Sequence, residues 1–410
     1  MKRYVLAGTG GRGYGMYAKA ITERFQDCAE LVGLFDVNEK RCRFVSENLP
    51  GSIPCYTDFD RMIAECRPDA VIVTTVDRYH SDYIIRALDM GIDVISEKPM
   101  TIDAEKCRSV LEAERRNGRN IVVTFNCRFM PHMAKIKEIL MEGAVGEILN
   151  VDFEWMLDTS HGADYFRRWH RKLENSGGLL VHKATHHFDI INWLIEQDPE
   201  TVYANGSLNF YGGNRREHGE RCSTCPQKAG CAYAFKEAEN PTIKGLYFDC
   251  EDVDGYYRDR CIFDEEINIY DSMSLSVRYS KGALMTYSLV AHSPYEGWKL
   301  SISGTKGRLE TCEFSSGTET DDPCFHIKVF NREGDAITYD MRKGSGMHGG
   351  GDDRMLQMLF RGGVPDTLHQ YAGSRDGSMS ILIGISANES IRTGRPVSVR
   401  ELVDVDSYRK

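Results

Sequence analysis

A lysine and two histidines are the side chains of this 410-residue chain whose types best suit the oxidation of an alcohol. Lys98 lies in the tripeptide Glu97-Lys98-Pro99, and His182 and His186 follow a pair of glycines. Removal of hydride from a carbinol carbon needs a base for the hydroxyl proton, and a neutral imidazole suits that role near pH 7. We expect His186 to be the base, Lys98 to bond the substrate oxygen, and His182 to relay a proton or contact the substrate.

The spacing of His182 and His186 also allows a metal site, because residues four positions apart share a helix face. Lys183 stands where a zinc protease motif has its glutamate, and its positive charge would repel a cation. Proton transfer is therefore the favoured interpretation of the two histidines. The adjacent His187 is expected to be a packing residue.

A glycine-rich turn near the N-terminus matches the dinucleotide-binding pattern G-x-G-x-x-G. The turn Gly8-Thr9-Gly10-Gly11-Arg12-Gly13 stands between a predicted strand and a predicted helix. Residues without Cβ let backbone N–H groups approach a pyrophosphate at the helix N-terminus. Asp36 ends the next predicted strand, where it would accept hydrogen bonds from ribose hydroxyls and repel a 2′-phosphate. NAD is the predicted cofactor; Lys40 and Arg41 follow closely and leave NADP as the less favoured alternative.

The elements that position these residues change in type along the chain. Up to residue 125, short apolar runs alternate with amphipathic helix-length segments, which is typical of a parallel sheet with crossover helices. The predicted strands are 4–7, 30–35, 70–74, 93–96 and 120–124, and the predicted helices are 15–25, 39–48, 80–90 and 104–117.

The alternation stops near Asn126, and the later segments follow another period. Residues alternate with period two over 272–279, 284–290, 300–304 and 327–331, which favours an open, mostly antiparallel sheet, and a helical tail is expected at 353–360 and 377–393. We therefore predict an α/β Rossmann domain at 1–125 and an α+β substrate-binding and oligomerisation domain at 126–410.

These motifs together resemble the Gfo/Idh/MocA family, named after glucose–fructose oxidoreductase, inositol dehydrogenase and a rhizopine catabolism protein. Glu97-Lys98-Pro99 is the family's most recognisable tripeptide, and the segment 75–80 resembles its Thr-Pro-Asn-x-x-His turn, with Val76 and Asp77 replacing Pro and Asn. His186 matches the family's catalytic histidine, whereas His182 stands where the family usually has an aspartate. The resemblance extends over nearly the whole chain and implies a Rossmann domain followed by a large open sheet.

The motifs and the resemblance together give an expected site. The expected cofactor-binding residues are Gly8, Gly10, Gly11, Arg12, Gly13, Asp36, Thr75, His80, Glu97, Lys98, Pro99 and Asn126. The expected substrate-contacting residues are Arg128, Trp169, His170, Arg171 and Asp189. For His348, which begins a glycine-rich stretch, a structural turn is favoured over a position in the substrate pocket.

The chain has 13 cysteines, and most are scattered singly, as small buried groups in a reducing compartment would be. The densest group lies in a polar insertion at about 209–262. Its spacing suits a closed, structural zinc site, with Cys261 favoured over Cys250 as the fourth ligand. The expected ligands are Cys222, Cys225, Cys231 and Cys261. Reduced thiols, a disulfide or an iron–sulfur centre remain the alternatives.

Charge and hydropathy exclude several classes of partner. The formal net charge is −10, and an acidic chain repels the phosphate backbone of nucleic acids. The longest apolar runs, such as 70–76, are far shorter than the roughly 20 residues needed to cross a bilayer. The N-terminal segment meets glycines too early for a secretory signal, so a cytoplasmic protein is expected. By resemblance, one face of the second sheet would join subunits into a homodimer or homotetramer.

The leading hypothesis is an NAD-dependent oxidoreductase that takes hydride from a secondary alcohol of a sugar, glycoside or cyclitol. One alternative is a redox-neutral glycosidase or lyase that retains NAD and acts through a transient keto-sugar, which the His182 replacement favours. The other alternative is a non-catalytic NAD-binding protein, against which Lys98 and His186 argue.

Overall fold

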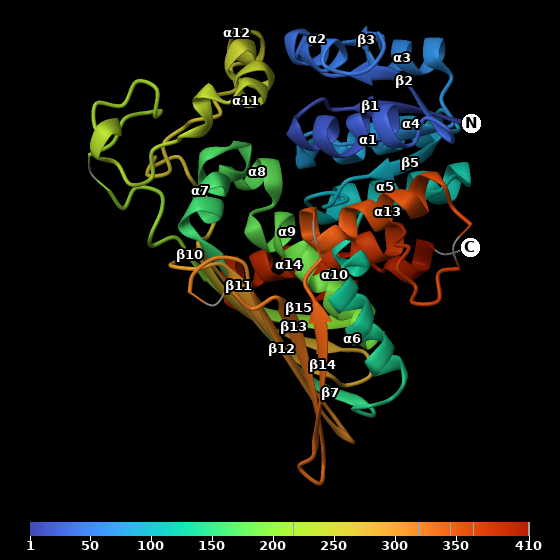
Figure 1. Ribbon diagram of the computed structural model, residues 1–410, viewed down its shortest axis with the longest axis vertical. Coiled ribbons are helices and arrows are strands. Elements are labelled where there is room, and N and C mark those ends of the chain that lie inside the picture. Colours follow the sequence, from blue (N-terminus) through green and yellow to red (C-terminus); the bar gives the residue numbers. More distant parts are fainter. Residues whose placement is uncertain (216, 319, 345, 364, 409–410) are drawn as a thin grey trace.

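Two sheets organise the chain, as the computed structural model shows (Figure 1). The structure describes residues 1–215, 217–318, 320–344, 346–363 and 365–408. A six-stranded parallel sheet with flanking helices is followed by a nine-stranded, mostly antiparallel sheet. The predicted fold class, a Rossmann domain followed by an α+β domain with a large open sheet, is confirmed.

The first sheet has the strand order β3-β2-β1-β4-β5-β6. Its strands are β1 Lys2–Ala7, β2 Ala29–Phe35, β3 Cys55–Tyr56, β4 Ala70–Val73, β5 Asp93–Ser96 and β6 Ile121–Val123. Its helices are α1 Lys19–Arg24, α2 Glu39–Glu47, α3 Phe59–Cys66, α4 His80–Asp89 and α5 Ala104–Asn117, and a π-helical turn at Gly13–Ala18 precedes α1. The order reverses between β1 and β4, and ligands bind at such a switch point in open α/β sheets.

Side chains of β1 alternate between two cores. Tyr4 and Leu6 pack in the core that contains α1 and α2, whereas Val5 and Ala7 pack in the core that contains α3, α4 and α5. A parallel sheet covered by helices on both faces requires this arrangement, and it explains why its strands are continuous apolar runs in the sequence.

The second sheet has the order β14-β13-β12-β11-β7-β10-β9-β8-β15, with β10 and β7 parallel. Its strands are β7 Ile148–Asp158, β8 Pro199–Ser207, β9 Ser272–Tyr279, β10 Leu284–Ser293, β11 Gly297–Gly304, β12 Gly307–Phe314, β13 Cys324–Asn331, β14 Ala336–Arg342 and β15 Val397–Ser398. Alternate residues along β9 are buried, as expected for a sheet with one covered face. The covering core includes residues of α10 Ala184–Ile195 and α14 Ser374–Thr393.

Three further helices follow β7 and lead into α10: α7 Thr159–Arg167, α8 Leu173–Ser176 and α9 Leu179–His182. The helix α6 Pro131–Met141 leads from the first sheet into β7, and the short α15 Val399–Leu402 follows β15. No helix in the described ranges combines the length and apolarity needed to cross a membrane.

Two segments return from the second domain to the first. The helix α13 Gly351–Phe360 places the Phe360 ring 5.2 Å from the rings of Tyr4 and Phe25. Within the insertion, α11 Pro241–Leu246 and α12 Glu251–Asp254 lie beside α2 (Figure 1). The two domains therefore contact each other through more than the covalent connection at residues 124–131.

Candidate active site

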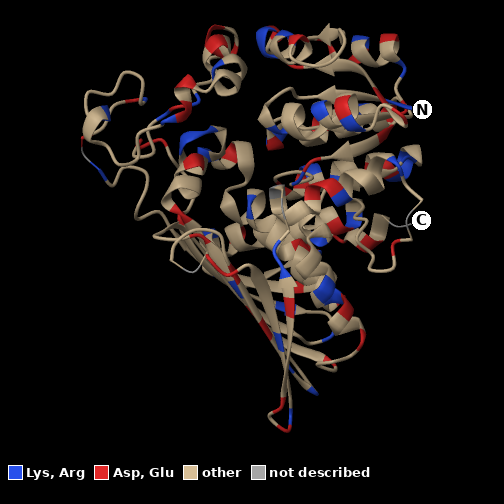
Figure 2. Cartoon of the chain, in the orientation of Figure 1, with Lys and Arg blue, Asp and Glu red and all other residues tan. Residues whose placement is uncertain are grey.

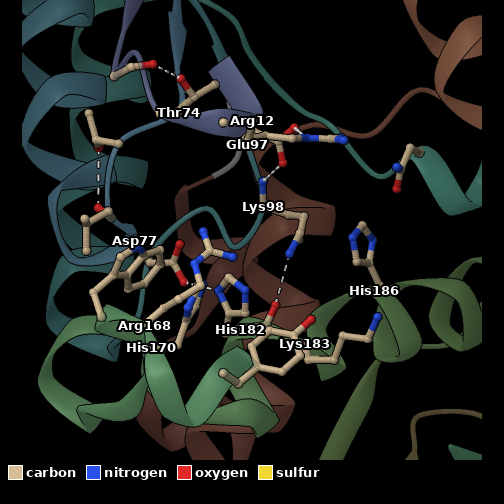
Figure 3. A pocket seen from close by; sticks show the side chains of 18 of the residues that line it. Arg12, Thr74, Asp77, Glu97, Lys98, Arg168, His170, His182, Lys183 and His186 are labelled. Atoms are coloured by element: carbon tan, nitrogen blue, oxygen red, sulfur yellow. Dashed lines mark hydrogen bonds and ion pairs between the residues drawn. The ribbon is translucent and has the colours of Figure 1, made fainter. Parts of the chain in front are cut away.

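A cavity of about 1040 Å³ lies between the carboxyl ends of the parallel strands and the helices that precede α10. It brings together most of the residues that the sequence singled out (Figure 3). The predicted residues that line it are Gly8, Gly10, Gly11, Arg12, Asp36, Thr75, His80, Glu97, Lys98, Asn126, Trp169, His170, His182 and His186. Both domains contribute to this wall.

The glycine loop needs its glycines for packing as well as for access. Gly8 has a φ of +98°, and a Cβ there would lie 2.7 Å from the backbone of Thr74. A Cβ on Gly13 would lie 2.2 Å from the carbonyl oxygen of Gly8. Gly13 therefore packs against the backbone of the loop and does not line the cavity, whereas Gly10 and Gly11 line it.

Asp36 is held by the loop that precedes it. Its Oδ2 accepts hydrogen bonds from the backbone N and the Oγ1 of Thr9, both at 2.9 Å. Its Oδ1 accepts from the backbone N of Asn38 at 2.9 Å and from the Arg41 guanidinium at 3.1 Å. A carboxylate offers about four acceptor positions, so these four contacts fix Asp36 at the cavity wall and fill its acceptor capacity.

The Glu97-Lys98-Pro99 bend is held from two sides. Glu97 Oε1 accepts from Arg12 Nε at 2.7 Å and from the Tyr17 hydroxyl at 2.8 Å. Burial alone would raise the Glu97 pKa, but the positive charges of Arg12 and Lys98 outweigh it and leave this pKa below its usual value. The His80 ring nitrogens lie 2.8 and 3.0 Å from the carbonyl oxygens of Pro99 and Thr75. His80 therefore supports the bend from behind.

Lys98 reaches across the domain boundary. Its Nζ donates to the carbonyl oxygen of His182 at 3.3 Å. Burial lowers the pKa of Lys98 to about 8, although the Glu97 carboxylate partly opposes this change. The amine therefore changes its charge within about one unit of physiological pH, a property that is common in groups that handle protons.

His182 forms a close pair with Asp77. The His182 Nδ1 lies 2.5 Å from Asp77 Oδ2, and both side chains are buried (Figure 3). Burial raises the pKa of Asp77 and lowers the pKa of His182, so burial favours the uncharged form of each side chain. Asp77 stands where the family pattern has an asparagine, and His182 stands where the family usually has an aspartate. The two residues that depart from the pattern are therefore partners of each other.

His186 is buried at the start of α10, and its Nδ1 has no hydrogen-bond partner within the described part of the chain. Burial and the neighbouring charges of Lys98 and Lys183 place its pKa well below the usual value, so the ring is neutral near pH 7. His187 lies next to it, but its ring stacks on Trp155 at 3.9 Å and its Nδ1 lies 2.7 Å from the Tyr287 hydroxyl.

His170 and Trp169 form the wall opposite the glycine loop. Their rings stack at 3.7 Å, and the His170 ring lies 4.2 Å from that of His182. The Nδ1 of His170 is buried without a hydrogen-bond partner among the described residues, and burial lowers the pKa of this ring well below the usual value. A neutral imidazole and an indole make this wall flat and mostly apolar.

Three residues that were expected to contact substrate do not line the cavity: Arg128, Arg171 and Asp189. Arg128 is 2% exposed and binds Asp189 through two nitrogens at 2.6 and 2.8 Å. Arg171 pairs with Asp264 at 2.7 Å. These charges are already neutralised inside the protein, so in this geometry they support the fold. Pro99 likewise lies behind the bend, where its carbonyl meets His80.

Other residues line the cavity without having been expected there: Asp77, His161, Tyr165, Arg168, Lys183, Tyr247, Asp254, Tyr256, Glu296, Trp298, Glu313 and His348. His348 has a φ of +49°, in keeping with a turn, yet it also lines the cavity, with its Nδ1 3.1 Å from Asn126 Nδ2. Asp77, Lys183 and His348 carry a signal in the sequence, because they stand in or beside the motifs. The others come from α7 and the residue after it, from the insertion, from β11 and the residue before it, and from β12, where no local pattern marks them.

The expected zinc site is not supported. Among the described residues, no three or more His, Cys, Asp or Glu side chains are grouped to hold a metal ion. The sulfur of Cys222 accepts from Arg167 at 3.2 Å, and the sulfur of Cys231 lies 3.8 Å from an Arg215 nitrogen. Cys225 bonds the Gln227 side chain at 3.3 Å. Guanidinium groups beside the sulfurs repel a cation, which the spacing of the cysteines alone does not reveal.

A Rossmann domain with a glycine loop, a buried lysine and neutral imidazoles at one cavity defines the class of dinucleotide-dependent oxidoreductases. Two family models match the chain: the "Oxidoreductase family, NAD-binding Rossmann fold" over residues 2–125 and the "Oxidoreductase family, C-terminal alpha/beta domain" over residues 137–399. The chain belongs to this family, GFO/IDH/MocA. The predictions of the family and of an NAD-binding dehydrogenase fold are confirmed.

Relatives support the same assignment. YteT of Bacillus subtilis (strain 168), which is named as an oxidoreductase, is 38% identical over 99% of this chain and 100% of its own. An inositol 2-dehydrogenase of Rubrobacter xylanophilus is 30% identical over 49% of this chain and 54% of its own. The WlbA dehydrogenase from Bordetella pertussis, solved with NADH and UDP-GlcNAcA, is similar in fold, with a TM-score of 0.66, 18% identity and coverage of 97% and 98% of the two chains.

The Asp189→Asn substitution tests the structural role of the Arg128–Asp189 pair. It leaves a buried guanidinium without its main counter-charge, and removal of one partner of a buried pair destabilises a protein by about 3–5 kcal/mol. We expect a clearly lower melting temperature and little change in substrate KM for the folded fraction. Asp198→Asn is the matched control, because Asp198 pairs with Arg375 at a partly exposed position, where the Asp198 side chain is 41% exposed. A raised KM with unchanged melting would contradict the structural assignment.

Proposed function

We propose that the protein is an NAD-dependent oxidoreductase that takes hydride from a secondary alcohol of a small polyhydroxylated molecule, a sugar, glycoside or cyclitol. The observation that carries this proposal is the meeting of Lys98, with a lowered pKa, and the neutral rings of His182 and His186 at the cavity that the glycine loop also lines. The inositol 2-dehydrogenase relative and the sugar nucleotide named with WlbA add support from outside the chain.

Residues around the glycine loop fit a bound dinucleotide. Gly10 and Gly11 offer an approach for phosphates at the start of the first helix, and Asp36 stands at the end of β2. NAD, when bound, would accept the hydride from the substrate carbon. The cavity volume, about 1040 Å³, slightly exceeds the usual range of about 300–1,000 Å³ for ligand sites.

The chain's own residues would manage the proton and the oxygen. The Lys98 ammonium would donate a hydrogen bond to the substrate oxygen and stabilise the negative charge that develops on it. His186, neutral near pH 7, would accept the hydroxyl proton as the C–H bond breaks. The Trp169 and His170 rings would form the flat wall along the sugar. Glu97 and His80 would hold the bend that aims Lys98.

The Asp77–His182 pair favours one alternative function. Because it places a second proton-transfer group at the same cavity, a transient ketone could lose a neighbouring C–H proton to the His182 ring. The adjacent C–O bond would then break, with that proton passing to the departing oxygen, water would add to the double bond that forms, and hydride would return to the carbonyl carbon. This redox-neutral reaction would release an aglycone without accumulating NADH. Incubation with aryl glycosides and with free polyols, monitored for both products, distinguishes the two functions.

Lys98→Ala and His186→Ala should each lower kcat/KM for polyol oxidation by about two to four orders of magnitude, the usual contribution of a general base or a charge at the reacting oxygen. NADH formation at 340 nm is the measurement, and NAD affinity of His186→Ala should stay close to wild type because the imidazole acts on the substrate. Lys281→Ala and His326→Ala, at exposed positions of the second sheet, are the matched controls. Wild-type rates in both test variants would exclude the proposed chemistry.

The pH profile should report Lys98. Because burial lowers its pKa to about 8, the ammonium form is complete well below pH 8 and is lost above it, so kcat/KM should fall on the alkaline side of about pH 8. Glu97 raises the Lys98 pKa, so Glu97→Gln should move this alkaline limb to lower pH. Glu138→Gln, on the exposed side of α6, is the control. An alkaline limb that does not move in Glu97→Gln would assign it to another group.

A further inference from the structure

The insertion at about 209–262 docks on the cofactor end of the Rossmann domain (Figure 1). A Cβ on Gly245 in α11 would lie 2.1 Å from the Phe44 ring of α2, so the two helices are in direct contact. Asn38 Nδ2 donates to the carbonyl oxygen of Cys250 at 2.9 Å, and Lys40 pairs with Asp252 at 2.6 Å. In Figure 2 the acidic α12 faces the basic start of α2. The contact is therefore both packed and charge-complementary.

One side chain of the insertion reaches the glycine loop itself. The backbone N of Gly11 donates to the Tyr247 hydroxyl at 2.9 Å, across 236 positions of sequence. The same hydroxyl would lie 3.2 Å from a Cβ on Gly11 and 3.8 Å from one on Gly10. Tyr247 also lines the cavity that Gly8 and Asp36 line. A hydroxyl at this position is within reach of any phosphate that the loop holds, and it can donate as well as accept.

Asp254 is the second side chain of the insertion that acts at this end of the cavity, because it pairs with Arg41 beside Asp36. The Arg41 guanidinium, 9% exposed, contacts Asp36 at 3.1 Å through one terminal nitrogen and Asp254 at 2.7 Å through the other. Its Nε donates to the carbonyl oxygen of Leu246 at 2.9 Å. An arginine close to this acidic position is the group that accommodates a 2′-phosphate in NADP-binding Rossmann domains. Here all three nitrogens of the Arg41 guanidinium already have partners. Asp254 and the carbonyl oxygen of Leu246, both in the insertion, bind two of them, and Asp36 binds the third.

We propose that the insertion is part of the cofactor site: Tyr247 supplies a hydroxyl to the dinucleotide phosphates, and Asp254 neutralises Arg41 so that a cofactor without a 2′-phosphate is preferred. The ligand class is a dinucleotide whose adenosine ribose carries free hydroxyls. A 2′-phosphate would have to displace Asp254 from Arg41 and then remain near two carboxylates, Asp36 and Asp254, both of which line the cavity. This inference rests on the proposed use of a dinucleotide but not on the identity of the alcohol.

The roles of the two residues predict different outcomes. Asp254→Asn frees the Arg41 guanidinium, so the NADP dissociation constant should fall by about tenfold or more while the NAD value changes little. Tyr247→Phe keeps the ring but removes the hydroxyl, so both cofactors should bind about fivefold more weakly and their ratio should stay constant. Asp249→Asn is the matched control for Asp254, because it removes a charge from the same insertion but from an exposed pair with Lys244, and neither residue lines the cavity. Its NAD-to-NADP ratio should equal that of the wild type.

The measurement is binding of NAD⁺, NADH and NADP⁺ to the full-length protein by titration calorimetry and, for NADH, by nicotinamide fluorescence, without any polyol. Melting temperatures of the free proteins check that each variant is folded. An unchanged ratio in Asp254→Asn, or unchanged or tighter binding in Tyr247→Phe, would overturn the proposal. Cofactor binding with the expected changes but no oxidation of any polyol would leave the inference intact and reject the proposed function.

Discussion

The hydrogen bond from the Lys98 amine to the carbonyl oxygen of His182 joins the two halves of the site. The bond fixes the amine next to the two imidazoles of the second domain. Burial of the amine at the boundary between the domains lowers its pKa. Much of the surrounding structure supports this placement. Arg12 and Tyr17 hold Glu97, and His80 holds Pro99, so that the bend carrying Lys98 is fixed on both sides.

The Asp77–His182 pair shows how two departures from the family pattern compensate each other. The family usually has an aspartate at position 182 and an asparagine at position 77, and this chain has a histidine and an aspartate. The two side chains meet at 2.5 Å, so a carboxyl group and an imidazole stand side by side at this position. Both line the cavity, and the His182 ring also lies close to His170.

Local patterns were sufficient to predict the parallel sheet and the motifs on it, because each strand and loop is encoded by a few neighbouring residues. The two-residue strand β3 is too short to carry a pattern, whereas the short helix α3 is amphipathic, with Phe59, Met62, Ile63 and Cys66 buried, and is nevertheless absent from the predicted elements. Partners distant in sequence were not predictable. Arg128 and Asp189 were each assigned to substrate although they neutralise each other across 61 positions, and the cysteine spacing gave no sign of the arginines beside the sulfurs. The Tyr247 contact with Gly11 was the hardest of these to predict, because the two residues are 236 positions apart in the sequence.

Contacts on two sides limit how far the Rossmann domain can move relative to the second sheet. On one side the Phe360 ring of α13 packs on Tyr4 and Phe25, and on the other α11 and α12 pack on α2. Separation of the domains would break the apolar contacts and expose the buried Arg41 charge, whose partners come from both domains. Since Lys98 and the imidazoles stand on opposite sides of this boundary, a fixed boundary keeps the reacting groups in register, and proton transfer depends on such short, stable separations. The insertion, whose own residues lie at the glycine-loop end of the cavity, thus helps to fix the position of Lys98 relative to the imidazoles.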